Sequence, residues 1–321
     1  MEWFGRAKIT FTHSASPLVF KTRDGGKTDL LEICKSVTPP CHLNPVLFNG
    51  HLQTMWTVTK DHGPQVYYRR RIFHADHKKY TGTFAVDFVV DPHADQDPTL
   101  PPRTAYYSED AFARIDSDDS RPMLIVLHGL SGGSHEVYLR HAIAPLVLGD
   151  GGRAWEVCVV NSRGCANSEV TSGVLFNARA TWDVRQIVNW ARRTFPNRPL
   201  FGLGFSLGAN IMTNYVGEEG SACPLKGAVV VGNPFDLQLS SKALQRTLLG
   251  KEVYQRFMGS MGFLQPVSLF PGLVRLTVLI AAANMKRLIG LHKESLMKHT
   301  DLPWDRIRNV TYLYEFDREV Q

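Results

Sequence analysis

The chain has 321 residues, of which 44% are hydrophobic and 21% charged, and its formal net charge is +6. This composition is that of an ordinary globular protein, and the length suits one large α/β domain with a substantial core. The basic residues are dispersed except for Arg69, Arg70 and Arg71, which we interpret as a solvated strand end. The charge distribution therefore argues against a nucleic-acid partner.

Several cofactor classes are excluded by motifs that the sequence lacks. The five cysteines have no C-x-x-C spacing and no paired histidines, so we expect reduced thiols and no metal site. No G-x-x-x-x-G-K-[ST] phosphate loop occurs, and Leu207 stands where a dinucleotide fingerprint needs its third glycine. Residues 1–8 lack the apolar core of a signal peptide or membrane anchor. We therefore expect a cytoplasmic protein without a cofactor.

Residues 1–120 are predicted to form an N-terminal extension with antiparallel edge strands. The beginning is irregular, with a short helix expected at residues 29–34. Residues 65–73 and 83–90 alternate apolar and polar side chains, as paired edge strands do. Residues 91–119 are dense in Pro, Asp and Ser, which is typical of a surface excursion.

Residues 121–236 are predicted to form a regular βα core. The expected elements alternate along the chain: strand 123–127, helix 135–147, strand 156–161, helix 181–193, strand 200–205, helix 209–216 and strand 226–231. In the second helix Val184, Ile187, Val188 and Ala191 form one apolar stripe. The first and last strands are continuous apolar runs, typical of strands buried on both faces. This pattern predicts a mostly parallel sheet with helices on both faces.

Residues 204–208 have the pattern G-x-S-x-G between an apolar strand and a helical pattern. This is the context of a nucleophile elbow, in which Gly204 and Gly208 permit a strained turn that lifts the Ser206 oxygen clear of the sheet edge. The pattern alone is weak, because a serine in an ordinary turn can match the same five letters.

A glycine-rich loop upstream strengthens the elbow interpretation. The apolar strand at residues 123–127 runs directly into His-Gly-Leu-Ser-Gly-Gly at residues 128–133. A hydrolase with an elbow takes one oxyanion N–H from the residue after the nucleophile and another from such a loop. Leu207 and Leu130 are the predicted donors, and Gly129 is the loop glycine beside them. Together the two motifs indicate an ester- or thioester-type hydrolase core.

Four motifs resemble those of one α/β-hydrolase subfamily and occur in its order, at residues 49–54, 128–134, 161–166 and 204–210. The subfamily holds the yeast medium-chain fatty-acid ethyl ester synthase/esterases and the animal abhydrolase-domain proteins one and three. The resemblance runs from residue 30 to residue 236 and resumes after residue 285. It implies an α/β-hydrolase fold, and we interpret residues 1–321 as a single domain of this fold.

The resemblance also implies a reaction and its partners. Ser206 would be the nucleophile, with Leu130 and Leu207 supplying the oxyanion N–H groups. The implied substrates are medium-chain acyl esters or acyl donors, whose acyl group passes to water or to an alcohol. Peripheral contact with a membrane or a lipid droplet is an open alternative to a purely cytoplasmic location, and the oligomeric state is left open.

The acid and base of a catalytic triad are not evident in this chain. An α/β-hydrolase places them after the nucleophile, on later strands. Because similar proteins are only entering their lid at residues 314–317, we expect the acid, the base and the C-terminal strands to lie beyond Gln321. We then expect an unpaired apolar edge strand at residues 309–314 or next to it.

The candidates within the chain are weak. Asp236 reads more simply as a turn residue, and His292 and His299 as solvated histidines of a charged helix at residues 285–298. His128, in the glycine-rich loop, is expected to shape that loop by hydrogen bonding and not to act as base.

Residues 237–321 are interpreted as a partial lid region with an insertion at residues 261–283. A membrane span is disfavoured there because Pro266, Pro271 and Arg275 interrupt the apolar run. A translated intron is preferred to a lid segment that touches lipid. The alternative to an active enzyme is a hydrolase-like binding or lipid-surface protein that is catalytically impaired, which a missing acid and base would explain.

Overall fold

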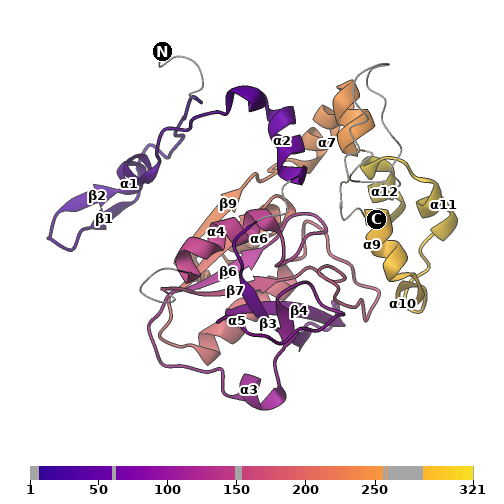
Figure 1. Cartoon of the computed structure of the whole chain (residues 1–321), viewed down its shortest axis with the longest axis horizontal. Helices are drawn as coiled ribbons and strands as arrows, with labels where there is room; N and C mark the ends of the chain where they lie inside the picture. Colours follow the sequence, from indigo (N-terminus) through magenta and orange to yellow (C-terminus); the bar gives the residue numbers. More distant parts are fainter. Residues whose placement is uncertain (1–6, 60–62, 149–153, 256–257, 259–284, 321) are drawn as a thin grey trace. The chain divides into compact units, whose positions relative to one another are not determined.

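The computed structural model of the chain (Figure 1) describes residues 7–59, 63–148, 154–255, 258 and 285–320. Its contacts divide the chain into two compact units, Met1–Lys60 and Asp61–Gln321. The insertion expected at residues 261–283 lies outside the described residues. The interpretation of residues 1–321 as a single domain stays a prediction.

The first unit contains a short antiparallel hairpin followed by helices. Its elements are β1 (Val19–Lys21), β2 (Lys27–Asp29), α1 (Leu30–Val37), the 3₁₀ helix η1 (Pro45–Leu47) and α2 (Gly50–Thr59). Asp29 ends the hairpin and caps α1, because its carboxylate accepts the N–H of Glu32 at 2.8 Å. The helix expected at residues 29–34 is therefore confirmed, with its end further along the chain.

The second unit is built on a seven-stranded sheet with the order β5-β3-β4-β7-β6-β8-β9. Its strands are β3 (Tyr67–His74), β4 (Thr83–Val90), β5 (Thr104–Tyr106), β6 (Met123–Leu127), β7 (Glu156–Val160), β8 (Leu200–Phe205) and β9 (Gly227–Val231). β3 and β4 form an antiparallel hairpin joined to β7, while β7, β6, β8 and β9 are parallel to one another. The mostly parallel sheet predicted from the sequence is confirmed.

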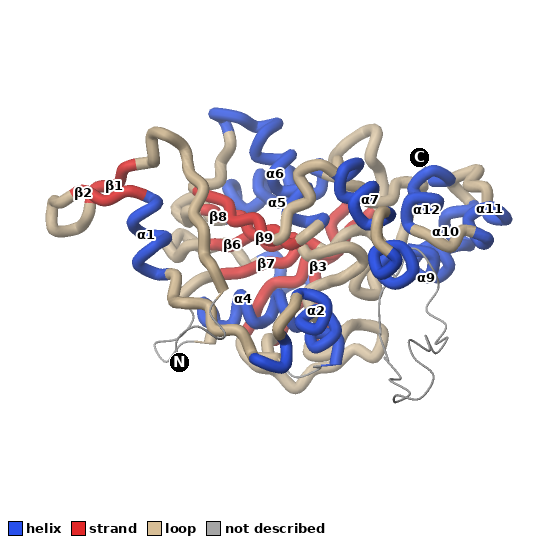
Figure 2. Tube along the Cα trace, turned by 90° about the horizontal axis from the view of Figure 1, so that it is seen from above, coloured by secondary structure: helices blue, strands red, loops and turns tan. Residues whose placement is uncertain are grey.

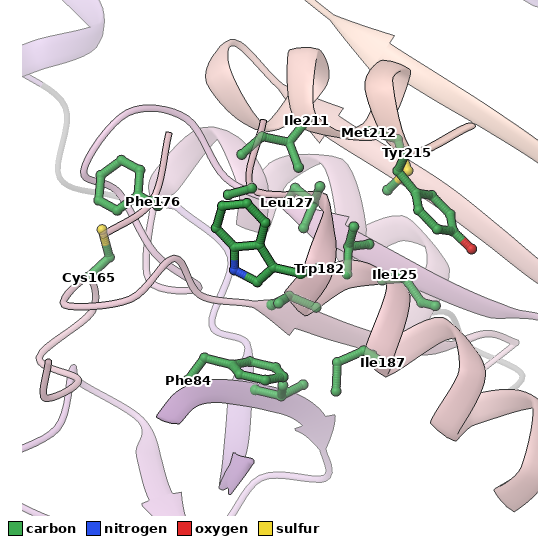
Figure 3. Close-up of a cluster of buried hydrophobic side chains, with 14 of the residues drawn as sticks. Phe84, Ile125, Leu127, Cys165, Phe176, Trp182, Ile187, Ile211, Met212 and Tyr215 are labelled. Atoms are coloured by element: carbon green, nitrogen blue, oxygen red, sulfur yellow. The ribbon is translucent and has the colours of Figure 1, made fainter. Parts of the chain in front are cut away.

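Helices cover both faces of this sheet (Figure 2). The helices of the second unit are α3 (Glu109–Ala113), α4 (Val137–Val147), α5 (Thr181–Thr194), α6 (Leu207–Glu219), the 3₁₀ helix η2 (Gly220–Ala222), α7 (Leu237–Gln245), the π-helix η3 (Gly250–Gln255), α9 (Met285–Leu291), α10 (Lys293–Met297), α11 (Trp304–Asn309) and α12 (Leu313–Val320). Because side chains alternate along a strand, Ile125 of β6 packs with α5 and α6 (Figure 3), whereas Val126 packs with α4. The apolar stripe predicted on α5 lies in the same core as Ile125.

Four sequence-based expectations about the strands are wrong. The strand β9 is not buried on both faces, because it is the last strand of the sheet and Val229 is 61% exposed. No strand forms at residues 309–314, where α11 ends and α12 begins. Arg70 is not solvated but 1% exposed, because it forms an ion pair inside the sheet. β3 and β4 are not edge strands, because β5, which lies within the surface excursion at residues 91–119, pairs with β3, and β7 pairs with β4.

The helices near the C-terminus contact the edge of the sheet where the parallel strands end. The hydroxyl of Ser131, which follows β6, lies 3.7 Å from Sδ of Met285 in α9. Nε2 of His292 lies 3.1 Å from the carbonyl oxygen of Gly164, which follows β7. The single charged helix expected at residues 285–298 is interrupted at His292, the residue before α10. These helices therefore lie against the loops that follow β6 and β7.

Candidate active site

Ser206 occupies the sharp turn between β8 and α6. Its φ of 50° and ψ of −115° are rarely adopted by residues other than glycine. Backbone hydrogen bonds hold the turn: the Ser206 N–H donates to Val231 O at 2.9 Å, and Ser206 O accepts from the Asn210 N–H at 3.1 Å. The residue is nevertheless exposed. A strained, exposed serine between a strand and a helix has the geometry of a nucleophile elbow.

The two glycines of the motif are required by close backbone packing. A Cβ atom at Gly204 would lie 2.5 Å from the carbonyl oxygen of Gly208, and one at Gly208 would lie 2.4 Å from the carbonyl oxygen of His128. Both distances are below any ordinary contact, so α6 approaches β6 and β8 this closely only without side chains at these positions.

Residues 128–134, which we call the glycine loop, lie beside the elbow. β6 and β8 are adjacent parallel strands with Leu127 paired to Gly204, so the loop and the elbow leave the sheet at the same edge. A Cβ atom at Gly129 would lie 3.5 Å from Cβ of Ser206. Leu207 is the first residue of α6, where N–H groups have no acceptor within the helix. The roles of Leu130 and Leu207 as oxyanion donors stay predictions that this arrangement supports.

The ring of His128 connects the glycine loop to the loop after β7. The Ser162 N–H donates to Nε2 of His128 at 3.0 Å, so in the neutral ring the proton is on Nδ1, which lies 2.6 Å from Gly129 O. Burial lowers the pKa of His128 to about 4, so the ring is neutral near pH 7. His128 therefore shapes the loop by hydrogen bonding, as its sequence context predicted.

We expect acid to destabilise the second unit through His128. Its folded pKa lies below the unfolded value of 6.5, so the free energy of unfolding falls as the pH drops from 6.5 to about 4. The loss from this ring is on the order of 3 kcal/mol, measurable by denaturant unfolding at about pH 7 and about pH 4. His128→Asn keeps a donor for Gly129 and should lose most of this pH dependence. An unchanged pH dependence in the variant would contradict the assignment.

Tyr138, on the first turn of α4, is a site residue that the sequence analysis missed. Its hydroxyl accepts the N–H of Gly129 at 2.9 Å, and its ring meets the ring of Phe205 edge-on, with centroids 5.0 Å apart. Although Tyr138 is 40% exposed, desolvation of its hydroxyl raises the pKa above its usual range, so the hydroxyl stays protonated. The side chain thus joins the glycine loop to the residue before Ser206. No local pattern marks this role, because it depends on how α4 folds back.

Tyr138→Phe is expected to slow the reaction of Ser206 more than it lowers stability. The variant keeps the ring contact with Phe205 but removes the acceptor of the Gly129 N–H, which costs about 1 kcal/mol at a site that water reaches. With the loop less well fixed, we expect Ser206 to react about tenfold more slowly with a fluorophosphonate. Tyr106→Phe, at a side chain of similar exposure in β5, is the control. Equal labelling rates for Tyr138→Phe and wild type would rule out this role.

Two of the three weak acid and base candidates make contacts of other kinds. The carboxylate of Asp236 caps α7 by accepting the N–H of Leu239 at 2.7 Å. The ring of His292 lies against Gly164, in the loop after β7, and His299 is exposed. These contacts explain Asp236 as a helix cap. His292 is half-buried against a neighbouring loop, so it is not the solvated histidine expected from the sequence. The assignment of a triad acid or base to any of them stays a prediction.

Other kinds of site are not seen among the described residues. In that part of the chain, no group of three or more His, Cys, Asp and Glu side chains could hold a metal ion. No helix formed by those same residues is long and apolar enough to cross a membrane. The five cysteines are free thiols, and burial raises the pKa of Cys158 and Cys165, which disfavours their reactive thiolate forms.

Comparison with known proteins extends these observations. The family model for the alpha/beta hydrolase fold matches residues 122–262. A monoacylglycerol lipase of Saccharomyces cerevisiae is 39% identical over 232 residues, which are 67% of this chain and 50% of that protein. Medium-chain fatty acid ethyl ester synthase/esterase 2 of the same yeast is 33% identical over 248 residues, 66% of this chain and 53% of its own length. Phospholipase ABHD3 of Mus musculus is 29% identical over 130 residues, 40% of this chain and 30% of the mouse protein.

The chain thus spans about half the length of the two yeast proteins that it matches. The family model covers β6 through β9 and therefore includes both the glycine loop and the elbow. Sheet order, elbow geometry and sequence similarity agree, and the chain has the α/β-hydrolase fold.

Proposed function

We propose that the chain carries the catalytic core of a serine carboxylic-ester hydrolase or acyltransferase that acts on medium-chain acyl esters. The observation that carries this proposal is the strained, exposed Ser206 at the end of β8, beside the glycine loop. The names of the two matched yeast proteins, a lipase and an ethyl ester synthase/esterase, support an ester of a fatty acid with a small alcohol as the substrate class.

In the proposed reaction the Ser206 Oγ attacks the acyl carbonyl carbon and its proton passes to a base. Negative charge then develops on the carbonyl oxygen, where the N–H groups of Leu130 and Leu207 are proposed to stabilise it. Collapse of this intermediate breaks the bond to the alcohol, which leaves with a proton, and the acyl group remains on Ser206. Water or a second alcohol then attacks the acyl-enzyme and restores the serine.

Hydrolysis and ester synthesis differ only in this second nucleophile. Which of them dominates depends on how well the site excludes water. The helices α9 and α10, which lie against the glycine loop and the loop after β7, are the proposed covering segment. Medium chain length and peripheral contact with a membrane or lipid droplet are further parts of this proposal.

The test combines active-site labelling with a substrate series. Ser206 should be labelled by a fluorophosphonate, and the protein together with the triad acid and base that the sequence analysis expects beyond Gln321 should hydrolyse nitrophenyl esters with a preference for medium acyl chains. With ethanol present, ethyl ester formation measured by mass spectrometry reports acyl transfer. Ser206→Ala supplies the blank for both assays. A preference for acetyl esters would refute the proposed acyl chain length.

A second candidate is a hydrolase-like binding or lipid-surface protein with impaired catalysis. It is favoured by the contacts of Asp236 and His292, which join these side chains to a helix end and a loop carbonyl. A folded chain that binds medium-chain fatty acid, while Ser206 stays unlabelled and no ester is turned over, would support this candidate over the first.

A further inference from the structure

A buried polar cluster at the end of the glycine loop takes no part in the chemistry proposed above. Its members are Arg70 in β3, Asp87 in β4, Ser134 at the end of the loop and Asn161 directly after β7. None of the four is more than 1% exposed. We call this group the Asp87 cluster.

The carboxylate of Asp87 is the centre of the cluster and accepts four hydrogen bonds. Arg70, its direct partner in the β3–β4 register, donates Nε at 2.6 Å and Nη2 at 2.8 Å. The Ser134 hydroxyl donates at 2.6 Å and the Asn161 side-chain amide at 2.8 Å. The remaining Nη1 of Arg70 donates to Ala166 O at 2.7 Å. The buried charges are thus paired and hydrogen-bonded, as burial requires.

Ser134 is bonded through each of its polar groups. Its N–H donates to Oδ1 of Asn161 at 3.1 Å, its hydroxyl donates to Asp87, and its carbonyl oxygen accepts from the Tyr68 hydroxyl at 2.9 Å. These partners come from β3, β4 and the end of β7. The end of the glycine loop is therefore attached to three strands at once.

The segment between Ser134 and the predicted oxyanion donor Leu130 is short and forms a tight turn. Leu130 precedes Ser134 by four residues, and between them the Gly132 N–H donates to Gly129 O at 3.2 Å. Ser131 has a positive φ of 53°, which few residues adopt without surrounding support. In a loop this tightly turned, a displacement of Ser134 is expected to shift the N–H of Leu130.

We propose that Asp87 is a positioning residue for the oxyanion hole: through Ser134 and Asn161 it fixes the glycine loop in the geometry that presents the Leu130 N–H. The proposal rests on the function proposed above for Leu130 and Ser206. A buried ion pair alone is weak evidence for stability, because apolar side chains of equal volume can hold a core as well. This pair is distinguished by its bonds to the end of the glycine loop.

A second buried pair in the same unit provides a matched control. Arg163 donates Nε at 2.9 Å and Nη2 at 2.8 Å to Asp183, so it has the same two-pronged geometry. Its other contacts are the carbonyl oxygens of Tyr80 and Thr81, in the connection between β3 and β4. Removing the charge of Asp183 breaks a pair of this kind without removing a bond to the glycine loop.

The experiment compares Asp87→Asn, Ser134→Ala and Asp183→Asn with wild type. Ser134→Ala leaves the Arg70–Asp87 pair intact, so it keeps the test open if Asp87→Asn does not fold. For each protein kcat and KM are measured on a medium-chain ester below its melting temperature. Hydrogen exchange of the amides at residues 129–134 reports the loop independently of catalysis.

We expect kcat to fall about 10²-fold in Asp87→Asn and about tenfold in Ser134→Ala, with KM nearly unchanged, because oxyanion donors act in the transition state. Loop amides should exchange faster in both variants, whereas Asp183→Asn should lower the melting temperature with little change in kcat or loop exchange. Equal losses of kcat in Asp87→Asn and Asp183→Asn would overturn the proposal. If wild type shows neither fluorophosphonate labelling of Ser206 nor turnover, the proposed function fails and loop exchange alone decides. Unchanged exchange in Ser134→Ala then refutes the positioning role.

Discussion

Gly208→Ala is expected to lower the free energy of unfolding by about 3 kcal/mol, a large share of what a domain has. The new Cβ would lie 2.4 Å from His128 O and 2.6 Å from Leu127 O. Both neighbours are backbone atoms at the end of a central strand, so no side chain can rotate away. Either α6 or the end of β6 has to move, and both carry groups of the candidate active site.

Gly217→Ala is the matched control, because it is the same substitution on the same helix. A Cβ at Gly217 meets nothing within 4 Å, and the residue lies inside α6. Alanine there reduces the freedom of the unfolded chain and should stabilise the protein by about 0.5 to 1 kcal/mol. In denaturant unfolding, the free energy of unfolding should therefore fall in Gly208→Ala and rise in Gly217→Ala. A Gly208→Ala protein as stable as wild type would show that β6 and α6 are not packed this closely.

The sequence predicted the parts of the fold that depend on local periodicity. The helix α5 repeats apolar side chains at helical spacing, and β6 is an unbroken apolar run. Local periodicity does not predict the burial of β9. This strand is an apolar run like β6, but it is the last strand in the sheet order. Burial on both faces depends on neighbours that a single strand does not encode.

The Arg70–Asp87 pair shows a second limit, because its charges were present in the sequence but not connected. We interpreted the triplet at residues 69–71 as solvated, while Asp87 is the single charged residue of β4. A buried charge needs a partner, and the hairpin register places Arg70 directly opposite. Pairing the two predicted strands through this lone aspartate would have identified the pair.

The candidate site likewise contains residues that a local motif identifies and residues that only the structure identifies. Ser206 and its two glycines are recognisable because the elbow is a local motif of five residues. The contact of Tyr138 with Gly129 depends on how a helix packs back on a loop, and the bonds of Ser134 join segments that are 27 and 47 residues apart. Such contacts follow from the three-dimensional arrangement of the sheet, so they emerge only in the structure.

Ser206→Ala is expected to abolish ester turnover and fluorophosphonate labelling. In hydrolases with a complete triad, loss of the nucleophile costs about 10⁶-fold in kcat. The remaining rate, about 10³ to 10⁴ above that in water, comes from substrate positioning and the oxyanion donors. A loss of turnover can be measured only if the wild type is active. Labelling of the wild type is therefore measured first and turnover second. Turnover within about tenfold of wild type would exclude Ser206 as the nucleophile.

Ser206→Gly distinguishes the loss of the nucleophilic hydroxyl from the relief of backbone strain at residue 206. Both Ser206→Ala and Ser206→Gly remove the hydroxyl, so both should be inactive. Only glycine adopts a φ of 50° with a ψ of −115° without steric cost, and such strain is worth about 1 to 3 kcal/mol. After subtracting the greater freedom of glycine in the unfolded chain, Ser206→Gly should be more stable than Ser206→Ala by about 1 kcal/mol. If Ser206→Gly were less stable than Ser206→Ala, the turn would not be strained. The exposed position of Ser206 would then need another explanation.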